Sequence, residues 1–213
     1  MSCHRVIRSW AHLKGVGIGL IIAGLLVLPG CDVMSIHPLY EDASPKDPDL
    51  VLEKDLTGLW SATDGKCTTI LTVSSNDEIY DFRSVEQGEG CSDPGKETRR
   101  QARLLKLDSH YFLDVSPRAE DVCETCLALH WISLARFDRD ALSLTPIDSD
   151  GLNKLLQAGT VHLNILPENP KLLIPERPMT LTALPKDLKT FCRKFAGNKK
   201  IFKPESTETF TRK

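Results

Sequence analysis

Two cysteines three positions apart, Cys123 and Cys126 in the sequence CETC, have the spacing in this chain that most directly suggests chemistry. Such a pair can be a redox centre when it opens a helix, because the helix N-terminus lowers a thiol pKa. It can also supply two zinc ligands, here with His130 and with His110 as a fourth candidate. In an exported protein it can form a structural disulfide in a loop. Because a strand is predicted after this pair, we expect the structural cross-link, with a thiol–disulfide oxidoreductase as the alternative function.

Three of the other cysteines lie in segments that indicate their pairing. Cys67 opens a predicted strand, and Cys91 lies in the glycine-rich loop EQGEGCSDPG after the next strand. A tight hairpin between the two strands would bring Cys67 within one loop's length of Cys91. Cys192 lies on the apolar stripe of a predicted helix, where a free buried thiol is expected. We therefore predict a Cys67–Cys91 bond, a Cys123–Cys126 bond and a free Cys192.

The remaining polar residues form no familiar catalytic motif. Gly-x-Ser-x-Gly, His-Glu-x-x-His, Ser-x-x-Lys and phosphate-loop patterns do not occur in the chain. Asp81, Asp114 and Asp138 are scattered over predicted strands and turns, and their spacing alone builds no acid–base pair. We therefore expect a non-catalytic protein with no metal or other cofactor.

The charge balance restricts the class of partner. The chain carries 27 basic and 29 acidic residues. Three of the basic residues and none of the acidic ones precede Cys31, so a chain beginning there would have a net charge of about −5. A surface without a basic field argues against nucleic acid or anionic lipid as the main partner. About 180 residues follow Cys31, enough for one domain with a substantial core.

Short β patterns separated by turn signals run from about residue 57 to the end of the chain. The segment Leu127–Phe137 is apolar on both faces, which indicates a central strand covered on both sides. Near residue 163, Val161, Leu163 and Ile165 alternate with polar residues, as in a strand with one buried face. The predicted strands are Thr57–Ala62, Lys66–Val73, Glu78–Val85, Arg99–Leu107, His110–Ser116, Leu127–Phe137, Ala141–Thr145, Thr160–Leu166, Thr180–Thr182 and Thr207–Arg212.

Two segments with helical periodicity interrupt the strands. The sequence DSDGLNKLLQAG (148–159) carries leucines on one stripe between an aspartate cap and a glycine stop. The sequence PKDLKTFCRKFAG (185–197) has apolar residues, Cys192 among them, at i, i+3, i+4 and i+7. We therefore predict a mainly β fold of the β-rich α+β class. Its antiparallel meander would form a barrel or a strongly curved sheet, with two short helices packed on it.

The first 30 residues have the pattern of a signal peptide. Three basic residues precede an uncharged apolar stretch from Gly15 to Gly30, which is shorter than the roughly 20 residues of a membrane-spanning helix. The sequence Leu28-Pro29-Gly30-Cys31 then resembles the bacterial lipobox, in which an aliphatic residue and a small residue precede an invariant cysteine. The resemblance implies a diacylglyceryl group on Cys31, cleavage before it and acylation of the new N-terminus. Two or three acyl chains would give durable attachment to a bilayer.

Asp32 follows the lipobox cysteine directly. In lipoproteins of this kind such an aspartate implies retention in the inner membrane, facing the periplasm. The segment 31–50 has three prolines and no periodicity, so we predict a flexible tether there. The predicted organisation is a signal peptide (1–30), a lipidated N-terminus with a tether (31–50) and a single β-rich domain (51–213).

The sequence TGLW at the first predicted strand contains Gly58-x-Trp60, and the chain ends in FTRK with Arg212. This combination resembles the lipocalin and wider calycin pattern, which implies a tryptophan at the closed end of a barrel beneath an arginine of the last strand. Such a guanidinium would stack on the indole. The lipobox, HPLY, DLTGLW and YFLDV together resemble a group of uncharacterised bacterial envelope lipoproteins, which implies no particular activity.

These observations predict a membrane-anchored envelope lipoprotein with a non-catalytic role, either as a scaffold or interaction protein or as a carrier of an apolar ligand. The expected partners are the bilayer, through acylated Cys31, and an envelope protein or an apolar ligand, but no nucleic acid. In a carrier, the apolar residues of the strand near residue 163 would line a cavity. In a scaffold they would pack on the helices through Leu156 and Phe191, and we expect the scaffold, because the helices need an apolar face to cover.

Overall fold

The structure, a computed structural model, describes residues 33–41, 47–77, 79–124, 126–166 and 179–213. Eight strands form the central sheet: β3 (Gly58–Asp64), β4 (Cys67–Asn76), β5 (Ile79–Gln87), β6 (Glu97–Leu107), β7 (His110–Ser116), β8 (His130–Phe137), β9 (Ala141–Pro146) and β11 (Glu208–Arg212). The other elements are β1 (Val33–Ser35), β2 (Leu50–Val51), β10 (Met179–Leu181), the helices α1 (Ser149–Gln157) and α2 (Pro185–Phe195), and the 3-10 turns η2 (Lys54–Leu56), η3 (Ala119–Asp121) and η4 (Pro204–Ser206).

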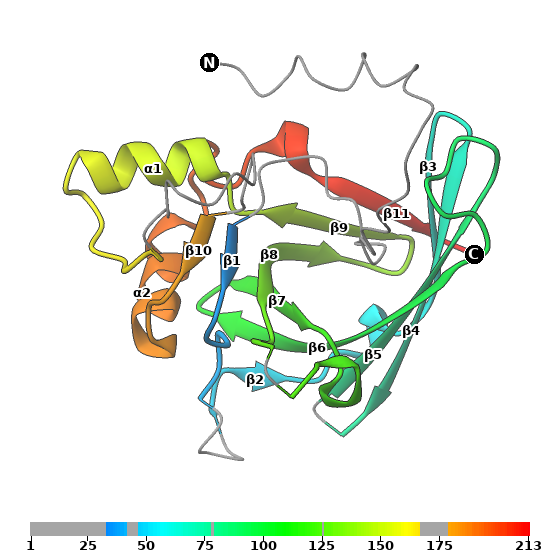
Figure 1. The fold of residues 1–213 in the computed structure, drawn as a ribbon, viewed down its shortest axis with the longest axis horizontal. Coiled ribbons are helices and arrows are strands. Elements are labelled where there is room, and N and C mark those ends of the chain that lie inside the picture. The colour runs from blue at the N-terminus through cyan, green and yellow to red at the C-terminus, as the bar shows by residue number, and fades with distance from the viewer. Residues whose placement is uncertain (1–32, 42–46, 78, 125, 167–178) are drawn as a thin grey trace.

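The eight central strands close into an antiparallel barrel. Strands β3 to β9 pair with their neighbours in chain order. The last strand, β11, pairs with β3 on one side and with β9 on the other, which closes the sheet (Figure 1). One edge of β8 pairs with two different strands. Residues 133–137 pair with β9, whereas His130 and Trp131 pair with β1. The predicted mainly β fold with an antiparallel meander is confirmed.

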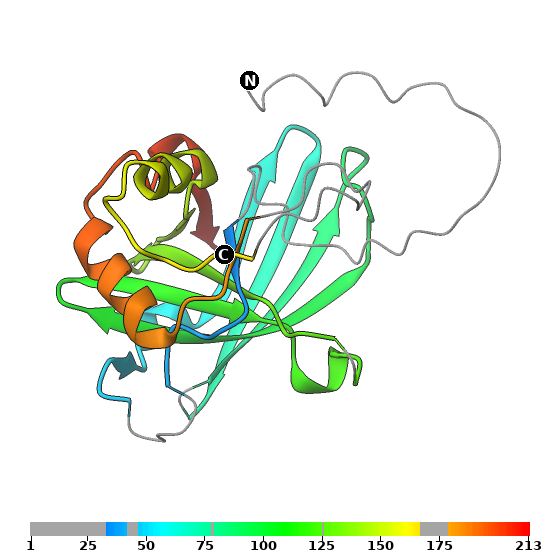
Figure 2. The same ribbon diagram turned by 60° about the vertical axis from the view of Figure 1, so that its left-hand side comes forward.

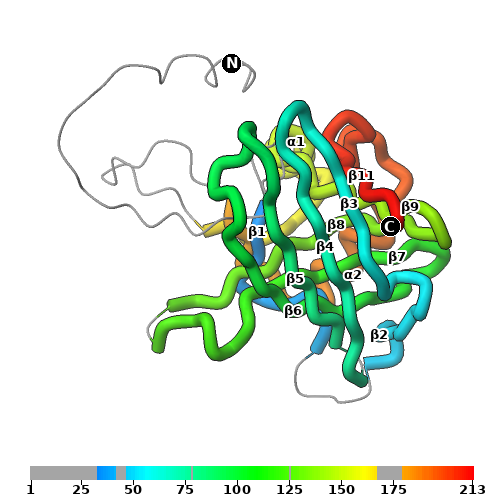
Figure 3. Tube along the Cα trace, turned by 90° about the vertical axis from the view of Figure 1, so that its right-hand side faces the viewer, coloured from blue at the N-terminus to red at the C-terminus, as the bar shows by residue number. Residues whose placement is uncertain are grey.

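Side chains that alternate along the strands form two hydrophobic cores. The inner core fills the barrel, and its largest members, Trp60, Tyr80, Phe82 and Phe210, are at most 1% exposed. The outer core lies between the outer wall of the barrel and the two helices. Both helices lie on one side of the barrel (Figures 1 and 2), where α2 contacts β6, and strands β3 to β5 on the opposite side carry no α-helix (Figure 3). Strand β8 contributes to both cores, so it is covered on both faces as predicted.

Both predicted helices are present, with the expected signals at their ends. The Asp148 carboxylate caps α1 by accepting a hydrogen bond from the N–H of Gly151 at 2.6 Å. Gly159 follows that helix with a φ of 65°, a conformation that favours glycine. Helix α2 begins at Pro185 and buries the predicted apolar stripe, including Cys192. The helical periodicity therefore identified the buried faces correctly.

The strand predicted at Thr160–Leu166 is wrong. Within this segment only Ile165 forms a β-bridge, and its partner is Leu181 of β10. Val161 and Leu163 instead pack into the outer core together with both helices. The ladder position beside β10 is occupied by β1, which pairs with it in parallel over three residues. The alternating pattern thus marks burial against helices, which is the contact expected of the scaffold arrangement.

The flexible tether predicted for residues 31–50 is also wrong over the part that the structure describes. Val33–Ser35 forms β1, which joins β8 to β10, and Leu39 is fully buried in the outer core. Further along, β2 pairs with β6. The prolines suggested a linker, but the apolar residues beside them pack against the barrel wall, so the folded domain already includes Val33. Residues 1–32, with Cys31 and Asp32, lie outside the described residues.

Candidate functional site

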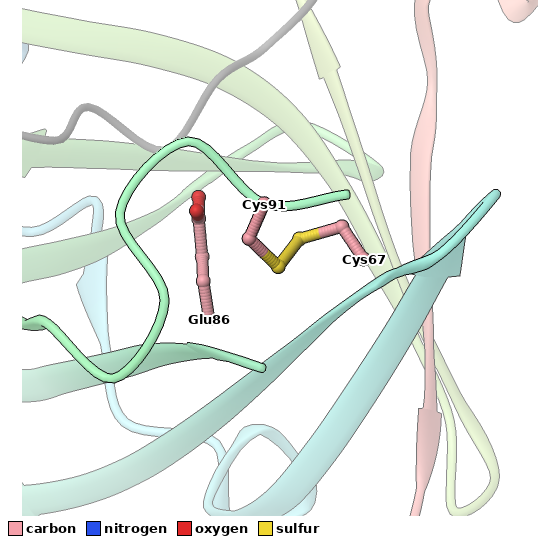
Figure 4. A group of neighbouring side chains, drawn as sticks. All are labelled: Cys67, Glu86 and Cys91. Carbon is pink, nitrogen blue, oxygen red and sulfur yellow. A yellow bond between two sulfur atoms is a disulfide. The ribbon is translucent and has the colours of Figure 1, made fainter. Parts of the chain in front are cut away.

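Both predicted disulfide bonds are present. Cys67, at the start of β4, is bonded to Cys91 in the loop after β5, with the two Cα atoms 4.8 Å apart. Glu86 lies beside this bond (Figure 4), and its carboxylate and the two sulfur atoms lie within 4.8 Å of one another. Because the sulfur atoms are bonded to each other, only the carboxylate can act as a strong ligand, and this form offers no zinc site. Cys192 is free, and burial raises the pKa of its thiol, which makes it unreactive.

The Cys123–Cys126 bond lies in an exposed loop between η3 and β8. No α-helix among the described residues begins at this pair, so the helix dipole that activates redox cysteines is not available to it. His130 is engaged elsewhere, since its Nδ1–H donates to Asp114 at 2.7 Å. His110 lies at the other end of β7, next to the turn from β6. The geometry thus supports a loop cross-link and does not assemble the metal ligand set considered for this pair.

Trp60 and Arg212 form one end of the barrel, as the sequence resemblance implies. Trp60 is fully buried, and its Nε1–H donates to the carbonyl of Leu56 at 3.1 Å. The Arg212 guanidinium lies 4.1 Å from the centroid of the indole ring and donates to the carbonyl of Thr57 at 2.8 Å. A Cβ at Gly58, whose φ is 143°, would collide with the Arg212 guanidinium. This contact explains why glycine precedes the tryptophan by two positions.

Polar side chains face the barrel interior on β5, β6, β8 and β11, away from the end that holds Trp60 and Arg212. Glu208 lies four residues from Arg212 on β11, in phase with buried Phe210. Trp131 is in phase with Ala135 on β8, in the half of the strand nearer His130. We call this group the polar layer, and its five members are Ser84, Arg100, Trp131, Ser133 and Glu208. The barrel therefore has an apolar end, which includes the Trp60–Arg212 pair, and a polar interior toward the other end.

Arg100 and Trp131 contact each other within the polar layer. The Arg100 guanidinium carbon lies 5.6 Å from the centroid of the Trp131 rings, within the range of a cation–π interaction. Trp131 Nε1 is buried and has no hydrogen-bond partner, and no other buried side-chain nitrogen or oxygen of the described residues is left without one. Desolvation lowers the pKa of Arg100, and the charge of Asp121 acts in the opposite direction. The pair thus combines a partly desolvated cation with an unused N–H donor.

Glu208 is the acidic member of the polar layer. Burial raises the pKa of its carboxyl to about 7. It pairs through the backbone with Leu144 of β9, an inner-core residue. At neutral pH this carboxyl is therefore protonated in a large fraction of the molecules, and in that form it can donate a hydrogen bond.

Replacing Glu208 with glutamine is expected to remove a pH dependence of stability. Above the unfolded-state pKa of about 4.5 the unfolded chain loses the proton, whereas the folded protein keeps it up to about pH 7. The wild-type free energy of unfolding should therefore decrease as the pH rises from 4.5 to 8, by about 3 kcal/mol more than that of Glu208→Gln. Urea denaturation at pH 4.5 and pH 8 measures this difference. Glu205→Gln, at an exposed position, should show the same pH dependence of stability as the wild type. If the stability of Glu208→Gln changed with pH as much as that of the wild type, the burial of Glu208 would not be the cause.

The polar layer was not identified from the sequence, although a signal for it exists. Arg100 occupies the same strand phase as Ala102 and Leu104, and Glu208 occupies the same phase as Phe210. A charged residue in the buried phase of a strand is unusual, because burial disfavours an unpaired charge. Extending the inward phase of each predicted strand toward its end would have selected Arg100 and Glu208 as interior polar residues.

A second buried polar cluster lies outside the barrel and fastens the N-terminal segment to it. The Asp114 carboxylate of β7 accepts the N–H of Leu39 at 2.6 Å and the Nδ1–H of His130 at 2.7 Å. The Tyr40 ring packs edge-on against His130, with centroids 6.4 Å apart, and the Arg103 guanidinium lies over the Tyr40 ring, 4.6 Å from its centroid. This set, the Asp114 cluster, replaces the sheet hydrogen bonds that residues 37–40 do not make.

Lys189 of α2 strengthens the same attachment. Its Nζ donates to both carboxylate oxygens of Asp47 at 2.7 Å and to Asp49 at 2.8 Å. Burial opposes ionisation of Asp47, but hydrogen bonds from Lys189 and from two backbone N–H groups outweigh it and lower the Asp47 pKa. Asp49 also accepts hydrogen bonds from Arg193, one turn further along α2. Helix α2 is therefore held to the N-terminal segment by charge as well as by apolar packing.

No protein-family model, curated protein or solved structure matches this chain. Among the described residues, no helix combines the length and hydropathy needed to cross a membrane.

Proposed function

We propose that this protein is a lipid-anchored, non-catalytic component of the bacterial cell envelope, and that its barrel is a rigid scaffold for interaction with another envelope protein. The observation that supports a scaffold is the filled apolar end of the barrel, where Trp60, Tyr80, Phe82 and Phe210 are at most 1% exposed. An eight-stranded barrel either fills its interior with side chains or holds one small ligand. Close packing of the inner core favours the first arrangement over a carrier of an apolar chain.

The position of β1 supports close attachment to a bilayer. Val33 begins this strand two residues after Cys31, the cysteine of the lipobox-like sequence. Two residues span at most about 7 Å, so an acylated Cys31 would hold the domain directly against the membrane surface rather than on a long linker. Asp32 would then keep the protein in the inner membrane, facing the periplasm. A rigid domain held close to the bilayer is suited to contacts with other membrane-attached proteins.

Cys31 is expected to be the mature N-terminus and to carry lipid. After expression in a bacterial host, intact-mass spectrometry should show a chain that begins at Cys31 with attached acyl groups, and the protein should partition into detergent. The Cys31→Ser variant should lose both properties because serine cannot form the thioether. Cys3→Ser, in the predicted leader, is the matched control and should behave as the wild type. A chain that begins at Met1, or a Cys31→Ser variant that stays in the membrane fraction, would contradict the anchor.

The same purified material tests the scaffold role. Solvent extraction of the folded lipoprotein should release no stoichiometric, non-covalently bound lipid, because the apolar end of the barrel is already occupied by side chains. Chemical cross-linking in intact cells should then give a defined adduct that depends on Cys31. One retained lipid per protein would overturn the scaffold in favour of a carrier, and this result would leave the anchor itself intact.

A further inference from the structure

We propose that the polar layer of the barrel is a binding site for an anionic group, a carboxylate or a phosphate, held by the guanidinium of Arg100 and the indole N–H of Trp131. Anion binding by these two residues requires neither a lipid anchor nor a protein partner, so it goes beyond the scaffold role. The group could belong to a small free anion or to the head of an acidic lipid, because both present the same acceptor oxygens.

The unpartnered N–H of Trp131 is the first observation behind this site. Buried polar groups in proteins nearly always have a hydrogen-bond partner. Trp131 Nε1 has no partner among the residues that the structure describes, although it is shielded from solvent. Leaving a buried donor unsatisfied is unfavourable, and an acceptor oxygen of a ligand would remove this penalty. Indole nitrogen is a donor only, so the missing partner must be an acceptor.

The unpaired charge of Arg100 is the second observation. On the outer face of the same sheet, Arg83 and Arg99 share Glu97 in ion pairs. Arg100, on the inner face, forms no ion pair with any residue that the structure describes, and its hydrogen bond among them is a weak 3.4 Å contact with the carbonyl of Arg99. A guanidinium that stacks on a ring keeps its in-plane N–H groups free, and these match the two oxygens of a carboxylate or phosphate.

The other residues of the polar layer are compatible with an anion. Ser84 and Ser133 are buried hydroxyl-bearing residues on the inner faces of β5 and β8, and a hydroxyl can donate to an anion. Glu208 on β11 faces the same interior, and burial raises its pKa to about 7. In its protonated form this carboxyl does not repel an anion. The interior therefore carries a cation, several donors and an acid that can be neutral.

The test is a titration of the full-length lipoprotein in non-ionic detergent, followed by the indole ¹H–¹⁵N signals. Cleavage of the leader is expected to remove Trp10, so that Trp60 and Trp131 give the two remaining indole signals. The variant Trp131→Phe assigns these two signals. Inorganic phosphate and octanoate are the free probes. Micelles doped with phosphatidylglycerol test the lipid source, with phosphatidylcholine as the control. We expect a saturable shift of the Trp131 signal and no comparable shift of the buried Trp60 signal.

Variants separate this site from general ionic effects. Arg100→Gln should weaken binding by about tenfold or more, because it removes a charge-assisted contact. Arg99→Gln, one residue away on the outer face, should leave binding unchanged, and an unaltered Trp60 signal shows that each variant is folded. Arg100→Lys should bind more weakly than the wild type, because an ammonium cannot form the bidentate contact. A shift that survives Arg100→Gln, or no shift with any probe, would overturn the site. A response to the acidic lipid alone would support the site and contradict the purely scaffold role.

Discussion

Replacement of Trp60 with alanine is expected to lower the free energy of unfolding by about 3–5 kcal/mol. The indole is fully buried at the apolar end of the barrel, so its removal leaves a cavity that rigid strands cannot easily close. The change also leaves the carbonyl of Leu56 without its 3.1 Å hydrogen bond and takes the aromatic face from beneath Arg212. Urea denaturation followed by circular dichroism measures the loss.

Two companion variants divide the contributions of Trp60. Trp60→Phe keeps an aromatic ring but removes the N–H donor, so its effect should be clearly smaller than that of alanine. Leu59→Ala, at the neighbouring position, removes a side chain that is 41% exposed and should change stability by less than about 1 kcal/mol. A Trp60→Ala protein within about 1 kcal/mol of the wild type would show that this residue does not organise the barrel end. Loss of membrane attachment without loss of stability would also contradict a structural role.

The elements predictable from the sequence are those whose burial follows a local period. The helical stripe that includes Cys192 and the two-sided apolar segment of β8 both specify their buried faces within a few residues. The hairpin between β4 and β5 likewise sets the register that brings Cys67 to Cys91. In each case the decisive contacts are made by residues near in sequence or by a face that the pattern already defines.

The features that local patterns could not predict depend on residues far apart in the chain. Strand β1 pairs with β8, where Met34 lies opposite Trp131, and with β10, and both partners lie far from it in the sequence. Lys189 donates a hydrogen bond to Asp47, which lies 142 residues away in the sequence. Nothing in the proline-rich sequence around Asp47 indicates this partner. The polar layer could be predicted in part. The strand pattern places Arg100 in the inward phase, but its contact with Trp131 depends on closure of the barrel. Tertiary context therefore decided whether a weak local pattern became a linker, a strand or a site.

Replacement of Asp114 with alanine is expected to cost about 3–5 kcal/mol, because it leaves two buried donors without their acceptor and each unsatisfied donor costs about 1–3 kcal/mol. Asp114 is 2% exposed, and both of its carboxylate oxygens are used, one by Leu39 N–H and the other by His130. These contacts hold the N-terminal segment on the outer wall. The loss should therefore be largest for residues 33–41, and hydrogen exchange should show their amides opening at a lower free energy than those of the barrel.

The controls for Asp114 decide whether the N-terminal segment is held by this carboxylate. Asp114→Asn keeps an acceptor for Leu39 but replaces the second oxygen with an amide donor, so its stability should lie between those of alanine and the wild type. Asp93→Ala removes an exposed ion pair with Lys96 and should cost less than about 1 kcal/mol. Because β1 begins two residues after Cys31, detachment of the segment would lengthen the link between the proposed lipid and the barrel. Unchanged exchange at residues 33–41 in Asp114→Ala would mean that apolar packing of Leu39 and the Lys189 contacts suffice, and the carboxylate would then lose this role.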